Sequence, residues 1–81
     1  GYYEGHYEKG LKNGLWKTYY EDGQLESEGH YENDLKIGIW KLFYHENGQL
    51  LSEGNYQKNL KIGIWKEYYD NGRLSEKGNY E

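Results

Sequence analysis

Apolar and polar residues alternate along the chain in short runs that are separated by turn-forming residues. The runs are rich in Tyr, Trp, Leu and Ile, and they lie near 1–8, 15–20, 24–32, 39–44, 49–57, 64–69 and 73–81. Alternation with a period of two and aromatic enrichment are typical of half-buried β-strands. The pattern therefore predicts an all-β fold of about seven strands, joined in sequence as an antiparallel meander.

Two kinds of turn separate the predicted strands. The first kind carries Asp-Gly or Asn-Gly, which supply the positive φ angles of tight hairpins, and it lies at 21–23, 45–48 and 70–72. The second kind opens with Lys9-Gly10, Asn33-Asp34 or Lys58-Asn59 and closes at Gly14, Gly38 or Gly63. Glycine, Asn and Asp all tolerate the left-handed region, so both kinds of segment are expected to reverse the chain.

The turn lengths set the expected register of the hairpins. A two-residue turn at Asp22-Gly23 would place Tyr20 opposite Leu25, Thr18 opposite Ser27 and Trp16 opposite Gly29. A three-residue turn at 46–48 would give the same pairs in the middle hairpin: Tyr44 with Leu50, Leu42 with Ser52 and Trp40 with Gly54. The last hairpin would pair Tyr69 with Leu74 and Trp65 with Gly78. We expect each indole to cover the glycine opposite to it.

The opposite face of the predicted sheet is mixed in character. Its columns are Leu15/Ile39/Ile64, Lys17/Lys41/Lys66 and Tyr19/Phe43/Tyr68. Such a face fits a solvated, elongated single-layer sheet better than a sandwich, because no second layer is available to cover it. In the last hairpin Lys66 would face Lys77 and Glu67 would face Glu76, which makes it the electrostatically weakest hairpin.

One unit recurs along the whole chain. Glycines recur at 5, 29, 54 and 78 and tryptophans at 16, 40 and 65, with intervals of 24 or 25 residues. Fixed periods of this length indicate a repeat architecture, in which each unit is stabilised by its neighbours. We divide the single domain 1–81 into repeats at about 5–28, 29–53 and 54–77, with a partial fourth from 78.

The repeated pattern Gly-x-Trp-x-x-[Tyr/Phe]-Tyr, an Asp-Gly or Asn-Gly turn, and then Leu-x-x-x-Gly-x-Tyr resembles the MORN repeat family (membrane occupation and recognition nexus), specifically its bacterial variant. Three copies, at 14–20, 38–44 and 63–69, carry the resemblance, which covers the chain from Gly5 to Tyr80. It implies an elongated sheet of stacked hairpins used for protein contacts, for assembly or, in some members, for lipid attachment. The bacterial variant also includes proteins that resemble antitoxins or immunity partners.

Composition and charge narrow the possible partners. Only 35% of the 81 residues are hydrophobic, and Cys is absent, so neither a conventional two-layer core nor a disulfide framework is expected. The net charge is −4 and the basic residues are scattered singly. A nucleic-acid backbone or an anionic lipid surface calls for a basic cluster. We therefore expect no nucleic acid, no membrane insertion and no lipid binding.

Candidate reactive groups favour structural roles. His6 and His30 hold equivalent positions in adjacent hairpins, about 9–10 Å apart, which is too far for two imidazoles to share a zinc ion. Ser27, Ser52 and Ser75 have no repeated His and acid partner that could activate a hydroxyl. We expect no enzyme, no cofactor and no metal site.

The remaining feature is aromatic. One face is predicted to carry a ladder of rings that could bind a ligand: Trp16, Tyr20, Tyr31, Trp40, Tyr44, Tyr56, Trp65, Tyr69 and Tyr80. We expect a non-catalytic scaffold for protein–protein interaction, such as antitoxin-like or immunity-like neutralisation, or self-association, through this aromatic face or through the edge strands near 1–8 and 73–81. The alternative is a carbohydrate-binding or cell-wall-binding repeat that uses the Trp and Tyr ladder.

Overall fold

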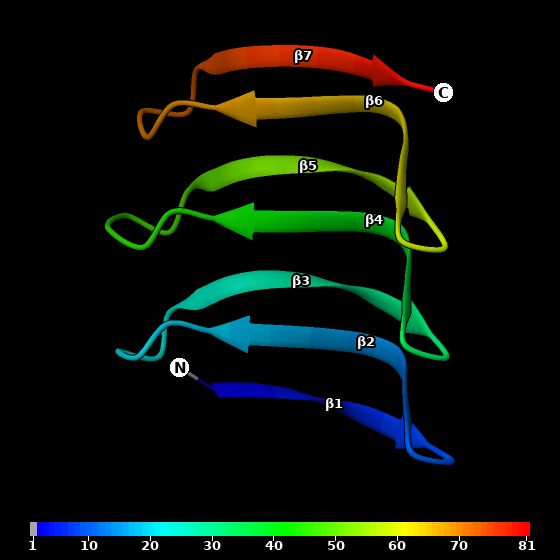
Figure 1. The fold of residues 1–81 in the computed structure, drawn as a ribbon. Helices are drawn as coiled ribbons and strands as arrows, with labels where there is room; N and C mark the ends of the chain where they lie inside the picture. The colour runs from blue at the N-terminus through cyan, green and yellow to red at the C-terminus, as the bar shows by residue number, and fades with distance from the viewer. Residues whose placement is uncertain (1) are drawn as a thin grey trace.

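The computed structural model describes residues 2–81 and arranges them as one open antiparallel sheet (Figure 1). Its seven strands are β1 (Tyr2–Glu8), β2 (Leu11–Tyr19), β3 (Leu25–Glu32), β4 (Leu35–Phe43), β5 (Leu50–Gln57), β6 (Leu60–Tyr68) and β7 (Leu74–Tyr80). They follow one another in the sheet in chain order. The predicted all-β meander is confirmed. Gly1, the first residue of the strand expected at 1–8, lies outside the described residues.

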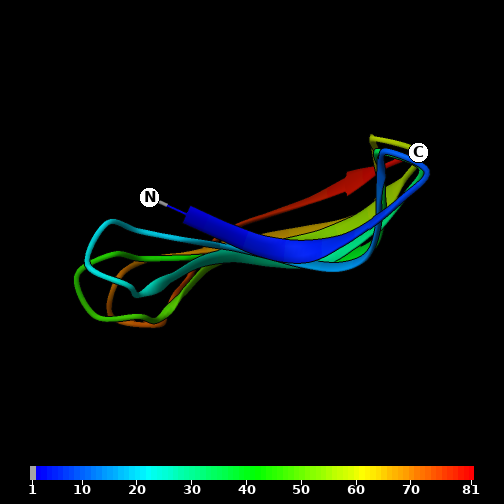
Figure 2. The same cartoon turned by 90° about the horizontal axis from the view of Figure 1, so that it is seen from below.

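The sheet forms a single layer. The molecule extends over 41 × 36 × 12 Å, and the edge-on view in Figure 2 shows a thin, bent ribbon with nothing packed on either face. Leu15, Ile39 and Ile64 on one face are 46–56% exposed. The buried apolar side chains of the described residues are Trp16, Trp40 and Trp65, at 3–8% exposure. The core is therefore one row of three indoles on one face.

The even-numbered strands begin earlier than the sequence pattern suggested. We expected strands from 15, 39 and 64, whereas β2, β4 and β6 start at Leu11, Leu35 and Leu60. The preceding turns are only two residues long, and both residues have positive φ, for example 52° at Lys9 and 81° at Gly10. This is the geometry that two-residue hairpins favour. Gly14, with φ 78°, does not close the turn but lies inside β2.

The Asp-Gly and Asn-Gly turns are one residue longer than expected. The Tyr20 amide donates to the Gln24 carbonyl at 2.8 Å, and the Gly23 amide donates to the Tyr20 carbonyl at 2.9 Å, so the loop is Glu21-Asp22-Gly23. Its left-handed glycine (φ 93°) gives the three-residue hairpin with a bulge. The equivalent bond from Tyr44 to Gln49 closes a four-residue loop, 45–48.

These longer loops shift one pair in each hairpin. Leu25, Leu50 and Leu74 pair with Tyr19, Phe43 and Tyr68, and not with Tyr20, Tyr44 and Tyr69 as expected. The other expected pairs are confirmed, including Trp16 with Gly29 and Thr18 with Ser27. The like-charge pairs of the last hairpin, Lys66 with Lys77 and Glu67 with Glu76, are also present.

Candidate binding face

Each indole lies over a glycine of the preceding strand. A Cβ added at Gly29 would stand 2.0 Å from Cδ2 of Trp40, and the same holds, at 2.1 Å, for Gly5 with Trp16 and for Gly54 with Trp65. The expectation that each indole covers the glycine paired with it in the following strand was therefore wrong. Trp16 pairs in register with Gly29 but lies on Gly5.

A bulge in each even strand explains this direction. Between Glu4 and His6 the register of β1 and β2 shifts, so that the segment Gly14-Leu15-Trp16 faces the single residue Gly5. The two extra residues in β2 bend the strand and re-aim its side chains. The positive φ of Gly14 permits the bend. The indole is then directed back over β1, where glycine leaves room for it.

The same three contacts hold every indole. Its Nε1 donates to the carbonyl of the residue after the glycine, at 3.0 Å for Trp40 and His30. Its ring packs in a T-shaped arrangement with the tyrosine two residues after the glycine, at 5.0 Å between the centroids of Trp40 and Tyr31. We call the glycine, the carbonyl and the tyrosine an indole site. Trp16 and Trp65 occupy equivalent sites on β1 and β5.

A row of tyrosines and lysines lies along the ladder of indoles. Lys36 Nζ lies 4.9 Å from the Trp40 ring centroid and 5.0 Å from that of Tyr56, and Lys12 and Lys61 make equivalent contacts. Such cation–π contacts hold the ammonium groups over the rings. We define the Tyr–Lys row by its members, in spatial order: Tyr7, Lys12, Tyr31, Lys36, Tyr56, Lys61 and Tyr80.

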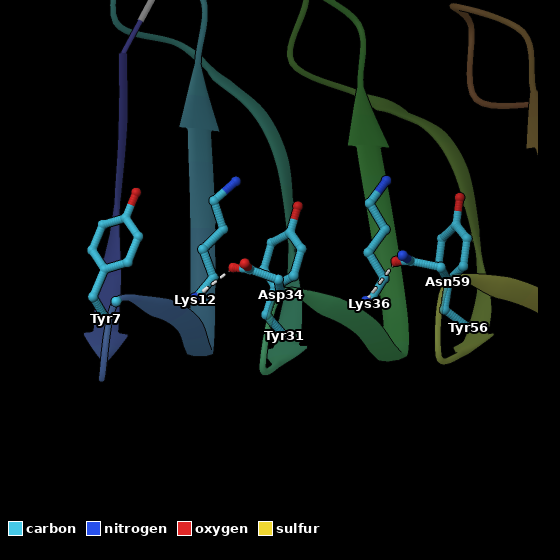
Figure 3. A pocket seen from close by; sticks show the side chains of 8 residues that line it. Tyr7, Lys12, Tyr31, Asp34, Lys36, Tyr56 and Asn59 are labelled. Carbon is cyan, nitrogen blue, oxygen red and sulfur yellow. Dashed lines mark hydrogen bonds between the residues drawn. The ribbon is translucent and has the colours of Figure 1, made fainter.

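Polar tips of this row point the same way. Figure 3 shows the hydroxyls of Tyr7, Tyr31 and Tyr56 and the ammonium groups of Lys12 and Lys36 side by side, at a hollow of about 620 Å³. Within residues 2–81 the structure gives these hydroxyls and ammonium groups no hydrogen bond or ion pair. Burial, followed by repulsion from its two lysine neighbours, lowers the pKa of Lys36. The row therefore offers alternating unpaired donors to a ligand, and an anion would relieve the repulsion.

Not all predicted members of the aromatic face belong to this ladder. Trp16, Tyr31, Trp40, Tyr56, Trp65 and Tyr80 form one edge-to-face series. Tyr20, Tyr44 and Tyr69 instead lie just beyond the strand ends. The Tyr20 hydroxyl donates to the Phe43 carbonyl and the Tyr44 hydroxyl to the Tyr68 carbonyl, both at 2.6 Å. These two hydrogen bonds connect each hairpin to the next one.

The sequence reasoning missed the lysines of the row and one contact between turns. A signal for Lys12, Lys36 and Lys61 was present, because each follows a leucine directly after a two-residue turn. In the second case, His45 Nε2 lies 2.8 Å from the Asp22 carboxylate of the neighbouring hairpin. No repeated signal marks this contact, because His45 lies in the loop at 45–48, which is one residue longer than the equivalent loops at 21–23 and 70–72.

Other kinds of site have little support in the described part of the chain. No three His, Cys, Asp or Glu side chains among residues 2–81 gather in a way that could hold a metal ion. His6 and His30 both lie exposed on their strands. Ser27 and Ser52 are buried, and the Ser27 hydroxyl shares a 2.6 Å hydrogen bond with Thr18. The same residues contain no helix that could cross a membrane.

The repeat units match a known family model. The model described as MORN repeat variant matches residues 12–33, 37–58 and 61–81, which together make up most of the chain. Each match starts in an even strand and so contains one indole and the following glycine strand. Comparisons with curated proteins and with solved structures gave no significant match.

Proposed function

The chain belongs to the MORN repeat variant family, and on this premise we propose that it is a non-catalytic protein-binding module whose ligand is an acidic, extended segment of a partner protein. Repeats of this family are modules for interaction with proteins or membranes. The Tyr–Lys row is the observation that supports a protein ligand, because tyrosine supplies contact area together with a polar tip and lysine selects for acidic groups.

The spacing of the row favours an extended ligand. Equivalent lysines lie two strand spacings apart, which is about 9–10 Å. A polyproline II segment repeats every three residues and rises about 9.3 Å in that distance. Acidic residues at every third position would therefore meet Lys12, Lys36 and Lys61 in turn. The aromatic floor between the lysines is also the kind of surface on which proline-rich segments dock.

The carbohydrate alternative has less support. Sugar-binding ladders need exposed aromatic faces, whereas the three indoles are buried and each donates its N–H to a backbone carbonyl. Antitoxin-like or immunity-like neutralisation would be one use of a protein-binding face, but no residue of the row is specific to that use. The partner is therefore identified by its chemistry, an acidic and extended segment.

The test uses a fluorescently labelled peptide of repeated Glu-Pro-Pro units and measures anisotropy against protein concentration. The variant Lys12→Gln/Lys36→Gln/Lys61→Gln removes the row's charges. The matched control, Lys17→Gln/Lys41→Gln/Lys66→Gln, removes three charges from the opposite face. We expect the row variant to weaken binding about tenfold, since three exposed ion pairs contribute about 0.5 kcal/mol each.

The control variant should bind within about twofold of the unmodified chain, because only screened long-range charge is lost. Peptides with Glu at every fourth position, or with Gln in place of Glu, should bind more weakly. Equal losses in the two triple variants, or no saturable binding of any of the acidic peptides, would refute the proposed role of the row.

A further inference from the structure

We propose that the face opposite to the Tyr–Lys row is a docking surface for an amphipathic helix of another protein, which lies across the strands. This goes beyond the proposed function, because it concerns the other face of the sheet and a different kind of ligand. Three aliphatic side chains form a line there, which we call the aliphatic column: Leu15, Ile39 and Ile64. They are 46%, 56% and 52% exposed, and nothing within residues 2–81 forms a second layer over them (Figure 2). Exposed apolar side chains gathered on one surface mark a place where another chain binds.

Hollows alternate with the side chains of the aliphatic column. One hollow, of about 600 Å³, lies between Leu15 and Ile39, and the other, of about 320 Å³, lies between Ile39 and Ile64. Their floors include the backbone at Gly29 on β3 and at Gly54 on β5. Because these strands are two apart in the sheet, the hollows follow one another at about 9–10 Å. The face therefore offers depressions for apolar side chains at a fixed interval.

The repeat of an α-helix fits this interval. Seven residues of a helix rise about 10.5 Å, which is close to two strand spacings of about 9–10 Å. Leucine at every seventh position would therefore enter successive hollows. Three residues after such a leucine, the same side of the helix passes over Ile39, which stands between the hollows. Only a small side chain, such as that of alanine, leaves room there.

A row of charges beside the column distinguishes a helix from an extended ligand. Neighbours in this row lie on adjacent strands, about 4.7–4.9 Å apart. One flank of a helix presents two residues in every seven, at rises of about 4.5 and 6 Å, and so can meet both signs of charge. One flank of a polyproline II segment presents one residue every 9.3 Å or so and can meet only one sign. We define the Lys–Glu row by its members, in spatial order: Lys17, Glu28, Lys41, Glu53 and Lys66.

The position of the charges relative to the hollows specifies the sequence of the helix. Glu28, on β3, lies beside the first hollow, and Lys41 follows it on β4. A leucine in that hollow places the next residue of the helix beside Glu28 and the fourth residue after the leucine beside Lys41. The helix should therefore repeat Leu-Lys-x-Ala-Glu-x-x. The ion pair found within residues 2–81 joins His45 to Asp22, so the charges of the Lys–Glu row remain available to a ligand.

A second copy of the chain fits this face poorly. Residues 2–81 form strands and contain no helix. Two sheets packed through this face would bury both Lys–Glu rows between them, and removing ionised groups from water is costly. A helix is only about 10–12 Å wide. It covers the aliphatic column while the ends of the lysine and glutamate side chains still reach water.

The experiment uses a fluorescently labelled peptide of three Leu-Lys-Gln-Ala-Glu-Gln-Ala units and follows its anisotropy as the full chain is added. We expect saturable binding and a gain of helical circular dichroism. Serine in place of the leucines should weaken binding at least about tenfold. Exchange of the peptide's Lys and Glu should weaken it about fivefold, because like charges then face each other. Proline in place of the central alanine should abolish binding, since it breaks the helix.

Variants of the protein test the face itself. Leu15→Thr/Ile39→Thr/Ile64→Thr should weaken peptide binding about tenfold or more, because it removes apolar area from the column. Threonine suits an exposed strand position, so the fold should be kept. Leu42→Thr is the matched control, because Leu42 is also exposed, at 43%, but pairs with Ser52 on the indole face. It should bind within about twofold of the unmodified chain. The peptide comparisons need no variant and stand whatever these substitutions do to folding.

Several results would overturn the inference. These are no saturable binding of the Leu-Lys-Gln-Ala-Glu-Gln-Ala peptide, binding without a gain of helix, undiminished binding of the proline peptide, and equal losses in the Leu42 and triple variants. Sedimentation of the free chain supplies one more, since a dimer that the triple variant dissociates would assign the face to a second copy. The proposed function is tested separately, with the Glu-Pro-Pro peptide and with variants of Lys12, Lys36 and Lys61, so either proposal can fail alone.

Discussion

The substitution Gly29→Ala tests the packing that organises this sheet. In the structure Gly29 lies under the Trp40 indole, and the new methyl carbon would stand 2.0 Å from Cδ2 and 2.2 Å from Cε2 of that ring. Atoms of a rigid ring and of a strand backbone cannot share this space. Either the indole must leave its site or β3 and β4 must separate locally.

The cost follows from what the indole would lose. Trp40 is 7% exposed, donates one hydrogen bond to His30 and contacts Tyr31 and Tyr56. Complete removal of a buried large aromatic costs about 3–5 kcal/mol, whereas overpacking with partial relaxation costs about 1–3 kcal/mol. We expect Gly29→Ala to lower the free energy of unfolding by about 2–4 kcal/mol.

Gly78→Ala is the internal control. Its methyl group meets nothing closer than 4.0 Å, and alanine in a strand loses less backbone entropy on folding than glycine. The free energy of unfolding should be unchanged or rise by up to about 0.5–1 kcal/mol. Urea unfolding followed by Trp fluorescence measures both variants. With m near 1 kcal/mol/M, the midpoint of Gly29→Ala should fall by about 2 M or more.

Equal midpoints for the two variants would refute the reasoning. Equal losses are the result expected if each indole covered the glycine paired with it in register, Trp16 on Gly29 and Trp65 on Gly78. A larger loss at Gly78 than at Gly29 would refute the reasoning too. Unfolding of Gly29→Ala in water alone would agree with the upper end of the estimate.

Three further outcomes follow from individual contacts. Tyr44→Phe should lose about 1 kcal/mol of stability with its 2.6 Å bond to the Tyr68 carbonyl, while Tyr69→Phe, an exposed hydroxyl without such a bond, should lose none in the same urea assay. The Gln24 amide, and after it His45, lowers the pKa of Asp22; an NMR titration should find its midpoint below that of an ordinary aspartate, with part of the shift kept in His45→Gln. The stability that this carboxylate contributes is present above the ordinary aspartate pKa and lost as pH falls through the lowered one. Because its pKa is lowered, Lys36 loses its charge at a lower pH than an ordinary lysine does. The affinity for the acidic peptide should therefore begin to fall at that lower pH, and anisotropy measured against pH checks this.

Strand number, order and most of the register could be predicted from the sequence. Tryptophan and glycine at a fixed period define the units, and alternation identifies the strands, because both features reflect local rules of backbone geometry. The turn lengths were less predictable. Asp-Gly fits both a two-residue loop and a three-residue loop with a type I turn. The structure uses the second, with Asp22 Oδ1 accepting the Gln24 amide.

The direction of each indole could not be predicted in the same way. Register pairing places Trp16 and Gly29 on one face, but it does not say whether the ring leans towards β1 or β3. That choice depends on the bulge at Gly14, which period-two counting does not detect. Four glycines and three tryptophans leave one glycine uncovered in either case, and only the structure identifies it as Gly78 and not Gly5.

The Tyr–Lys row was missed for a related reason. The sequence pattern placed Lys12, Lys36 and Lys61 in turns, so it could not assign their side chains to either face of the sheet. Once β2, β4 and β6 begin at Leu11, Leu35 and Leu60, these lysines lie two residues before the bulge glycines and above the aromatic ladder. A scattered set of single basic residues in the sequence thus becomes one line in the fold.

Direct mapping of the ligand surface tests the central claim, that this chain binds an acidic segment through the Tyr–Lys row. Lysine Nζ and tyrosine ring signals would be assigned by NMR and followed as the Glu-Pro-Pro peptide is added. We expect the largest shifts at Lys12, Lys36 and Lys61 and at Tyr31 and Tyr56, with Lys17, Lys41 and Lys66 unchanged. Shifts centred on the opposite face, at Leu15, Ile39 and Ile64, would contradict the account.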